Sequence, residues 1–263
     1  MPSRLTVVLV SLLLATPLLI FWLWLVILPA RVTMLCPEGC QCETGGYCVD
    51  CSCTSLKSVP LIHLTNVREL KLSINNITLW KKDSFISLTE LDELYIELCG
   101  LRTIRLEAFS GLAKLTGLFL AGNGIENLYS AVFSGLVNLK FTNLRKNKLQ
   151  NLHPDTSSRL PNLQKLYSVN NWGLHTPTDS NFINSHSLSS LYISFCNFSS
   201  VSVETFANVS ALECLDLCHN KLKTVDINKL RALPKMSKMY LDGIPLHCDC
   251  QLQELWRWCK ERN

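Results

Sequence analysis

The sequence contains little charge of either sign. Lysine, arginine, aspartate and glutamate make up 17% of its 263 residues, and the formal net charge is only +4. Proteins that bind nucleic acids need a dense positive field, because phosphate contacts supply much of their affinity. This chain lacks such a field, so we expect no nucleic-acid ligand.

The sequence also lacks the signatures of catalysis. Its six histidines are scattered, and it has no His-Glu-x-x-His pair, no glycine-rich phosphate loop and no nucleophile elbow. Asp216 and His219 form one suggestive pair, and a solvated pair at the rim of a surface is the simpler interpretation of it. We therefore expect no enzymatic activity and no cofactor.

A long uncharged run opens the chain. No charged residue occurs from Leu5 to Leu28, and Arg4 stands immediately before the run. The run exceeds the roughly 7–15 apolar residues of most signal peptides and reaches the roughly 20 that span a bilayer. Residues 1–35 are thus predicted to be a cleaved signal peptide or an uncleaved signal anchor, with membrane association through residues 5–28 in the second case. Either way, the chain from Cys36 onward lies outside the cytosol.

Cysteine content agrees with an oxidising compartment. Six of the thirteen cysteines fall between Cys36 and Cys53, and three fall between Cys248 and Cys259. Because thirteen is odd, at least one cysteine has no partner within the chain. Three Asn-x-Ser/Thr triplets are glycosylation acceptors that agree with secretion. Their asparagines are Asn76, Asn197 and Asn208.

A repeat of 24 residues fills the region between the two cysteine clusters. The central L-x-L of the unit L-x-x-L-x-L-x-x-N-x-L is predicted to be a short strand with inward-pointing leucines, while the rest of the unit returns over the outer surface. Stacked units would share one core and form a parallel sheet on the concave face. The unit begins at Val67, Leu91, Leu115, Leu139, Leu163, Leu188, Leu212 and Met236, at intervals of 24 residues with one interval of 25.

The asparagine column of the repeat is predicted to lie inside the stack, where it pairs with buried backbone groups of the loops. Cys99 and Cys196 occupy this column, and we interpret both as buried free thiols. The fifth unit carries the extra residue, and a local bulge is expected at Asn170-Asn171-Trp172-Gly173.

Cysteine motifs flank the repeats. Cys36-Pro37-Glu38-Gly39-Cys40-Gln41-Cys42 precedes Val49-Asp50-Cys51-Ser52, and Ile244-Pro245-Leu246-His247-Cys248-Asp249-Cys250 precedes Leu255-Trp256-Arg257-Trp258. With the repeat, these motifs resemble the caps of extracellular leucine-rich-repeat proteins, a group that includes Toll-like receptors, Slit-type guidance proteins and lamprey variable lymphocyte receptors.

The resemblance implies a fold and a division of the chain. The fold is an α/β solenoid, a leucine-rich-repeat horseshoe with a parallel concave β-sheet and short helical or irregular convex segments. After residues 1–35, the expected parts are a cysteine-rich N-terminal cap (36–60), eight repeats (61–246) and the start of a C-terminal cap (247–263).

The resemblance also implies disulfides. In the family pattern the bridges of the N-terminal cap are Cys36–Cys42 and Cys40–Cys51. Cys48 and Cys53 are additional to this pattern, and we pair them with each other.

The C-terminal cap is expected to be incomplete, because the chain stops at Asn263 before the two later cysteines that normally bond the C-x-C pair. Cys259 can bond one of Cys248 and Cys250, and we take Cys250 as its partner. Zinc is the alternative use of these clustered cysteines and of His247. The secretory context favours disulfides, so no metal is expected.

The residue between the two inward leucines of each strand should face the concavity. Five of the eight residues in this column are aromatic, although aromatic residues make up 8% of the chain. Solvent-facing tyrosines are typical of contact surfaces, although tyrosine also favours strands for packing reasons alone. After Lys71 the column continues with the predicted ligand-binding residues Tyr95, Phe119, Asn143, Tyr167, Tyr192, Asp216 and Tyr240.

Charged residues of both signs should rim this column, and a mixed rim suits a protein ligand better than a polyanion. Cys214 and Cys218 should lie on the same face, too far apart to bond each other. The rim comprises Glu69, Glu93, Glu97, Arg145, Lys146, Lys165, Glu213 and Lys238.

Together these features predict an extracellular recognition module, secreted or anchored at the cell surface, that binds a protein ligand through its concave face. The alternative is an adhesive or matrix structural protein anchored at the cell surface.

Overall fold

The computed structural model describes residues 36–77, 80, 83–152, 154–176, 181–201, 204–225, 233–247 and 250–261. The chain divides into two units, residues 1–35 and 36–263. The predicted signal peptide or anchor lies outside the described residues. Within the described residues, none of the helices has the length and hydropathy of a membrane span.

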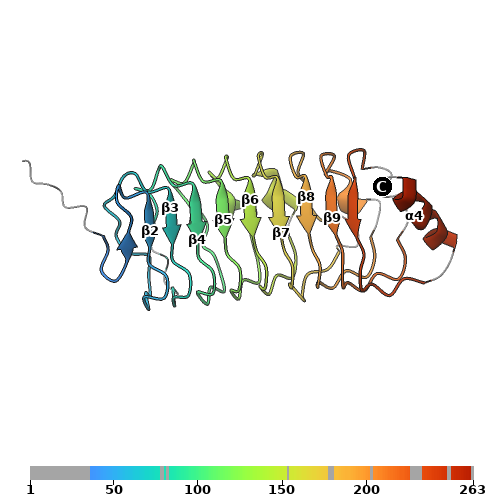
Figure 1. Cartoon of the computed structure of the whole chain (residues 1–263), viewed down its shortest axis with the longest axis horizontal. Coiled ribbons are helices and arrows are strands. Elements are labelled where there is room, and N and C mark those ends of the chain that lie inside the picture. The colour runs from blue at the N-terminus through green and yellow to red at the C-terminus, as the bar shows by residue number, and fades with distance from the viewer. Residues whose placement is uncertain are drawn as a thin grey trace, which may run out of the picture. The chain divides into compact units, whose positions relative to one another are not determined.

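Ten short strands form one sheet whose strand order follows the chain (Figure 1). β1 (Gln41–Cys42) pairs antiparallel with β2 (Cys48–Asp50), and each later strand pairs in parallel with the one before it. The later strands are β3 (Glu69–Lys71), β4 (Glu93–Tyr95), β5 (Gly117–Phe119), β6 (Phe141–Asn143), β7 (Lys165–Tyr167), β8 (Ser190–Tyr192), β9 (Cys214–Asp216) and β10 (Lys238–Tyr240).

The repeat period sets the register of the sheet. Leu70 is the Cα partner of Leu94, which in turn pairs with Leu118, so the same position of each unit meets its equivalent in the next. The central residue of a strand points into the core, and Leu70, Leu94 and Leu118 have no exposed surface. Burying one leucine contributes about 1.5–3 kcal/mol, which makes this column a main source of stability. The predicted parallel solenoid is confirmed.

Short helical segments lie on the side of the unit away from the strands. They are η1 (Ser130–Phe133), α2 (Pro154–Ser158) and η2 (Glu204–Phe206). A column of phenylalanines packs beneath them: the rings of Phe109 and Phe133 lie parallel, with centroids 6.4 Å apart. In the fifth unit Ser157 takes the place of this phenylalanine, and a cavity of about 20 Å³ lies in the core between Ser157 and Thr142.

The asparagine column bonds one repeat to the next, as predicted. The Asn123 Nδ2 group donates to the carbonyl oxygens of Ile96 at 2.7 Å and Leu120 at 2.9 Å. Its Oδ1 atom accepts the N–H groups of Cys99 at 2.9 Å and Leu101 at 3.2 Å. One side chain therefore satisfies four buried backbone groups that would otherwise cost about 1–3 kcal/mol each.

Cysteine replaces asparagine at two positions of this column. Cys99 and Cys196 are buried and free, which confirms the interpretation made from the sequence. The Cys99 thiol donates to the Leu72 carbonyl at 3.2 Å, and the Cys196 thiol donates to the Ser168 carbonyl at 3.3 Å. Burial raises the pKa of Cys196 to about 12, so this thiol keeps its proton at neutral pH.

The extra residue of the fifth unit forms the expected bulge. Asn171 stays in the buried column, and a turn at residues 172–173 is closed by a bond from the Leu174 N–H to the Asn171 carbonyl at 2.9 Å. Leu174 then resumes the pattern, because its carbonyl accepts the Asn197 N–H in the next repeat. The bulge leaves Trp172 67% exposed.

The N-terminal cysteines form part of the sheet. The bridges Cys36–Cys42 and Cys40–Cys51 are both present, as the resemblance implied. The register pairs Val49 with Leu70, so β2 continues the ladder of the repeats into the cap.

The predicted Cys48–Cys53 bond is wrong, because both thiols are free. Cys48 lies in β2 opposite Glu69, the Cys51 N–H donates to Lys71, and the Cys53 N–H donates to Ser73, so the backbone from Cys48 to Cys53 follows the neighbouring repeat. The partners Glu69 and Ser73 are four residues apart, about 13 Å in an extended chain, whereas a disulfide needs Cα atoms within about 7 Å.

Helix α4 (Cys250–Glu261) follows the last repeat. Leu255 and Trp258 on this helix are buried and join the hydrophobic core of the solenoid. Cys248 and the side chains of Cys250 and Cys259 lie outside the described part of the chain, so the predicted Cys250–Cys259 bond remains a prediction.

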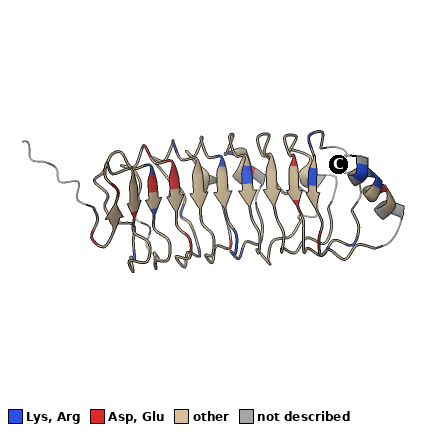
Figure 2. Cartoon of the chain, in the orientation of Figure 1, with Lys and Arg blue, Asp and Glu red and all other residues tan. Residues whose placement is uncertain are grey.

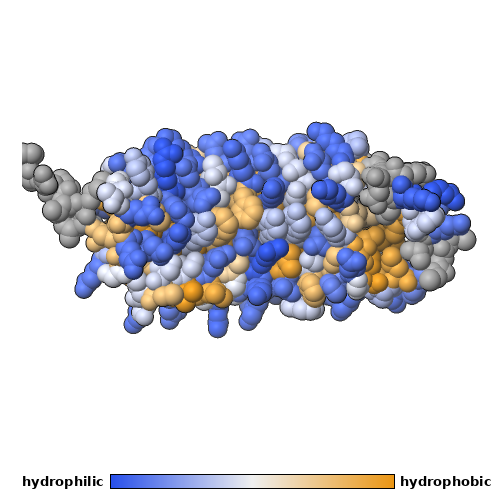
Figure 3. Space-filling view, viewed as in Figure 1, coloured by the Kyte–Doolittle hydropathy of each residue, from blue (hydrophilic) through white to orange (hydrophobic). Residues whose placement is uncertain are grey.

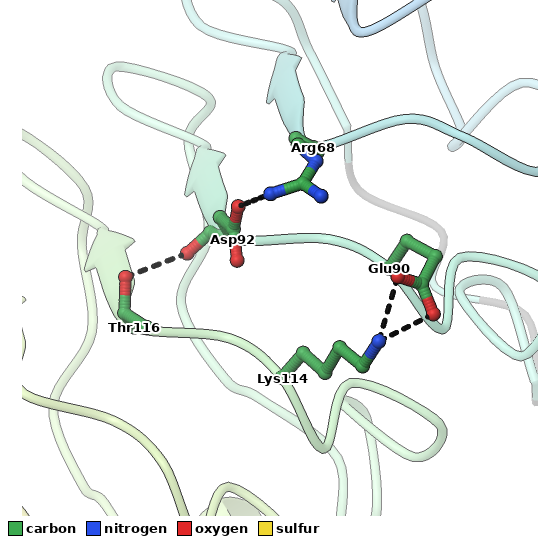
Figure 4. Close-up of polar contacts among 5 residues, drawn as sticks. All are labelled: Arg68, Glu90, Asp92, Lys114 and Thr116. Carbon is green, nitrogen blue, oxygen red and sulfur yellow. Dashed lines mark hydrogen bonds and ion pairs between the residues drawn. The ribbon is translucent and has the colours of Figure 1, made fainter.

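Polar contacts also repeat at the period of the fold (Figure 4). Lys114 forms an ion pair with Glu90 at 2.6 Å, and Arg68 forms one with Asp92 at 3.3 Å, each pair being 24 residues apart. The Asp92 carbonyl also accepts the Thr116 hydroxyl at 3.3 Å. Because these groups are exposed, water screens them and they contribute little to stability.

Candidate functional site

The solvent side of the sheet, called the sheet face below, carries the residues predicted to bind a ligand. Tyr95, Phe119, Tyr167 and Tyr192 are each partly exposed, whereas the strand residues before them are buried. Lys71, Asn143 and Asp216 are placed in the same way, and Tyr240 is 44% exposed. Alternation along each strand therefore brings the whole column to one surface.

Five aromatic rings on this face form a continuous stack across β4 to β8. The rings of Tyr95 and Phe119 are parallel, with centroids 4.2 Å apart, and those of Tyr167 and Tyr192 are parallel at the same separation. Phe141 lies between the two pairs, 5.0 Å from Phe119 and 5.2 Å from Tyr167. We call these five residues the aromatic stack.

Phe141 is the member that sequence analysis missed. It is the first residue of β6 rather than the third, and a three-residue strand exposes both its first and third residues on the same face. Both the first and the third residue of each strand should therefore have been considered as candidate ligand-binding residues. Tyr240, by contrast, was predicted but lies apart from the stack, because Asp216 on β9 separates it from Tyr192.

A glycine makes room for the stack. Gly117 is the first residue of β5, and a Cβ atom there would lie 3.1 Å from Cε2 of Phe119 and 3.4 Å from Cγ of Glu93. A larger side chain would therefore push the Phe119 ring out of its present position. In the space-filling view, hydrophobic atoms lie near the middle of the sheet face over β5 and β6, with hydrophilic neighbours around them (Figure 3).

Acidic residues border the stack on the side of β3 and β4 (Figure 2). Glu93 accepts the Tyr95 hydroxyl at 2.6 Å, and Glu97 accepts the Asn143 Nδ2 group at 3.2 Å. Burial raises the pKa of Glu97. Lys71 is held at 3.0 Å by Glu69, and this bond raises the Lys71 pKa.

Basic residues lie beside the later half of the stack and beyond it. The Arg145 guanidinium lies over the Tyr167 ring, 4.6 Å from its centroid. Lys165 on β7 and Lys238 on β10 are exposed on the sheet face (Figure 2). The predicted mixed rim is therefore acidic over β3 and β4 and of mixed sign over the later strands, where Glu213 and Asp216 lie between Lys165 and Lys238.

Asp216 and His219, the pair that suggested a catalytic site in the sequence, each contact other residues. Asp216 accepts the Ser194 hydroxyl at 2.8 Å and the Cys218 N–H at 3.0 Å. The His219 ring instead stacks on Phe195, with centroids 4.2 Å apart.

The two thiols near the end of the sheet face are free. The Cys214 thiol donates to the Tyr192 hydroxyl, and the Cys218 thiol donates to Asp242, both at 3.8 Å. Burial, followed by the bond to Asp216, raises the pKa of Cys218 to about 12, which keeps it a protonated, weakly nucleophilic thiol. Within the described ranges, no three His, Cys, Asp or Glu side chains are grouped in a way that could hold a metal ion.

Comparisons with known proteins agree with this architecture. A family model described as leucine rich repeat matches residues 65–125, 91–149, 118–171 and 186–246. One similar solved structure is that of human 5T4, also named Wnt-activated inhibitory factor 1 and trophoblast glycoprotein. It is 26% identical to this chain, with a TM-score of 0.72 over 88% of each chain. A search of curated proteins found no match.

Proposed function

Because this chain belongs to the leucine-rich-repeat family, whose fold is a protein-interaction module, we propose that it captures a protein ligand on the sheet face. The single observation that carries this proposal is the aromatic stack. Tyrosine and phenylalanine supply large contact areas with few rotatable bonds, and such residues dominate binding energy at the centres of interfaces.

The dimensions of the sheet face suit a protein partner. Adjacent strands lie about 4.8 Å apart, so the stack from β4 to β8 spans roughly 19 Å and the face from β3 to β10 spans roughly 34 Å. A standard interface covers about 800 Å² on each partner, which is more than the stack alone provides. The charged strands on both sides would complete the contact. A partner that fits this arrangement presents basic groups toward Glu69, Glu93 and Glu97 and acidic groups toward Arg145 and Lys165.

The proposal places the protein outside the cytosol, secreted or anchored at the cell surface. The bridges Cys36–Cys42 and Cys40–Cys51 support this location, because disulfides persist in oxidising compartments. The similar human 5T4 is a glycoprotein by name, which agrees with the same location. We propose a binding protein rather than an enzyme, since family members of this fold typically serve as scaffolds for recognition.

The decisive experiment removes three rings of the stack together. The full chain would be expressed in secretory cells with a proximity-labelling enzyme fused to its C-terminus, and labelled surface proteins identified by mass spectrometry. Tyr95→Ala/Tyr167→Ala/Tyr192→Ala should reduce labelling of the specific partner at least about 100-fold, because each hot-spot ring contributes about 2 kcal/mol or more.

The matched control is Tyr129→Ala, since Tyr129 is 63% exposed but does not lie on a strand of the sheet. The control should label the same partner as the unaltered chain. Equal labelling by the triple variant, with an unchanged circular dichroism spectrum, would rule out the sheet face. Labelling of a second copy of this chain alone would favour the adhesive alternative.

A further inference from the structure

A second aromatic group lies at the loops that follow the strands, away from the sheet face. The Trp172 indole meets the Phe195 ring edge-on, with centroids 6.3 Å apart and an interplanar angle of 70°. Phe195 in turn stacks on the His219 ring, with an interplanar angle of 19°. These three side chains come from three consecutive repeats, and we call them the aromatic shelf. Trp172 is 67% exposed, and with the neighbouring rings it offers a contiguous apolar surface that a ligand could cover.

The backbone turn of the repeat holds the shelf outward. Phe195 and His219 have φ angles of 53° and 54°, in the left-handed region that bulky residues seldom occupy. Gly243 follows in the same column, and a Cβ atom there would collide with the His219 ring. The same column has positive φ angles at Ile74, Leu98, Lys146 and Asn170, so the turn of the repeat itself sets this conformation and directs the side chain of this position outward. At this position, the shelf differs from the other repeats only in carrying rings.

The acceptor Asn197 lies beside this shelf. Cys196 and Phe198 are buried, whereas Phe195 and Asn197 are partly exposed and Ser199 is exposed, so the acceptor and the Phe195 ring both reach the surface. The Asn197 N–H donates to the Leu174 carbonyl at 2.8 Å, which ties the acceptor to the bulge that carries Trp172. An exposed or partly exposed ring therefore lies two residues from Asn197 in its own repeat and two residues from its backbone partner Leu174 in the preceding one.

We propose that Asn197 carries an N-linked glycan whose first sugar packs its C–H face against the aromatic shelf. The inference rests on the extracellular location in the proposed function. Nδ2 of Asn197 would bond to the anomeric carbon of an oligosaccharide linked to a lipid diphosphate, losing one proton while the lipid diphosphate leaves. The exchange is redox-neutral. The sugar covers apolar ring surface that is otherwise exposed to water, and the chain itself supplies the occupant of the shelf.

The two other acceptors provide a comparison. Asn208 also follows a phenylalanine by two residues, but Phe206 is only 4% exposed and belongs to the core. Asn76 follows the exposed Ile74, which has no ring, and its neighbour in the next repeat is Gly100. A glycan on Asn208 or Asn76 therefore has no aromatic surface to cover, and its removal should leave stability unchanged.

The test is a double-mutant cycle on the full chain expressed in secretory cells. Ser199→Ala removes the acceptor triplet at Asn197, and Ser210→Ala removes the one at Asn208. Site occupancy is measured by glycopeptide mass spectrometry, and the melting temperature is measured for each purified protein. Ser199→Ala should lower the melting temperature by roughly 2–4 °C, and Ser210→Ala should leave it unchanged. In a Trp172→Ala/Phe195→Leu background, Ser199→Ala should have no effect, because the glycan has lost its shelf.

Each other result of this experiment contradicts a specific part of the proposal. If Asn76 or Asn208 is glycosylated but Asn197 is not, the proposed glycan on the aromatic shelf is refuted, whereas the extracellular location is supported. If none of the three is glycosylated, the proposed location fails as well. If Asn197 is glycosylated but Ser199→Ala lowers the melting temperature equally in both backgrounds, the packing of the sugar on the shelf is refuted. A lowered melting temperature for both single variants would indicate a general effect of glycans and would also overturn the proposal.

Discussion

The rings of Tyr167 and Tyr192 lie parallel at one end of the aromatic stack, with 4° between their planes. Burial, followed by hydrogen bonds with Cys214 and Tyr167, raises the pKa of Tyr192 above its ordinary value. At the other end, burial and the bond to Glu93 raise the pKa of Tyr95 in the same direction. The stack therefore favours the neutral phenol at both ends.

These pKa shifts predict a loss of stability at high pH. An unfolded tyrosine ionises near its ordinary pKa of about 10, while the folded forms of Tyr95 and Tyr192 still hold their protons. Their contribution to stability is complete below that pH and is lost as pH rises through the folded pKa values. Tyr95→Phe/Tyr192→Phe should thus flatten the decline in unfolding free energy above about pH 10. Urea unfolding at a series of pH values measures this, and an equal flattening by the exposed-site control Tyr129→Phe would contradict it.

Thr142 predicts a stabilising substitution. Its side chain is 2% exposed, its hydroxyl has no hydrogen-bond partner, and it lines the cavity near Ser157. Thr142→Val keeps the shape and removes the unpaired hydroxyl, so the free energy of unfolding should rise by about 1–2 kcal/mol. Thermal unfolding should show a melting temperature roughly 2–8 °C higher. The control is Thr116→Val, which loses the bond to Asp92 and should give no gain.

The free thiols predict a pattern of chemical labelling. Cys53 is exposed, so iodoacetamide should alkylate it in the native protein. Cys196 is buried and its pKa is raised to about 12, so it should react only after unfolding. Peptide mapping by mass spectrometry distinguishes the two sites. A Cys48–Cys53 bridge in the native protein would show as an unlabelled Cys53 and would contradict the free thiols described above.

Sequence periodicity predicted those parts of the fold that repeat. The 24-residue spacing alone places Leu70, Leu94 and Leu118 in register, because each stacked unit must align with its neighbour. The same reasoning correctly placed Cys99 and Cys196 among the buried asparagines. The bulge at Trp172 was also predictable, because one unit has 25 residues and the core positions on both sides of it are kept.

Contacts between columns were not predictable in this way. The stack depends on Phe141, whose ring fills the space between Phe119 and Tyr167 only because repeat four has a large side chain at the first position of its strand. The Cys48–Cys53 pairing failed because it rested only on both cysteines being additional to the family pattern, whereas Cys48 is held in the strand β2 and both thiols are free. The aromatic shelf joins Trp172, Phe195 and His219, which no local pattern connects.

The pairing of β2 with β3 has a consequence for folding. Repeats that share one pattern could dock one unit out of step, because Leu94 presents nearly the same surface to Leu118 as Leu70 does to Leu94. β2 resembles no repeat, and its end of the chain is fastened by Cys36–Cys42 and Cys40–Cys51. The first repeat can therefore dock correctly only against β2. Each later repeat is then positioned by the repeat before it. The cap therefore fixes the register in which all later repeats stack.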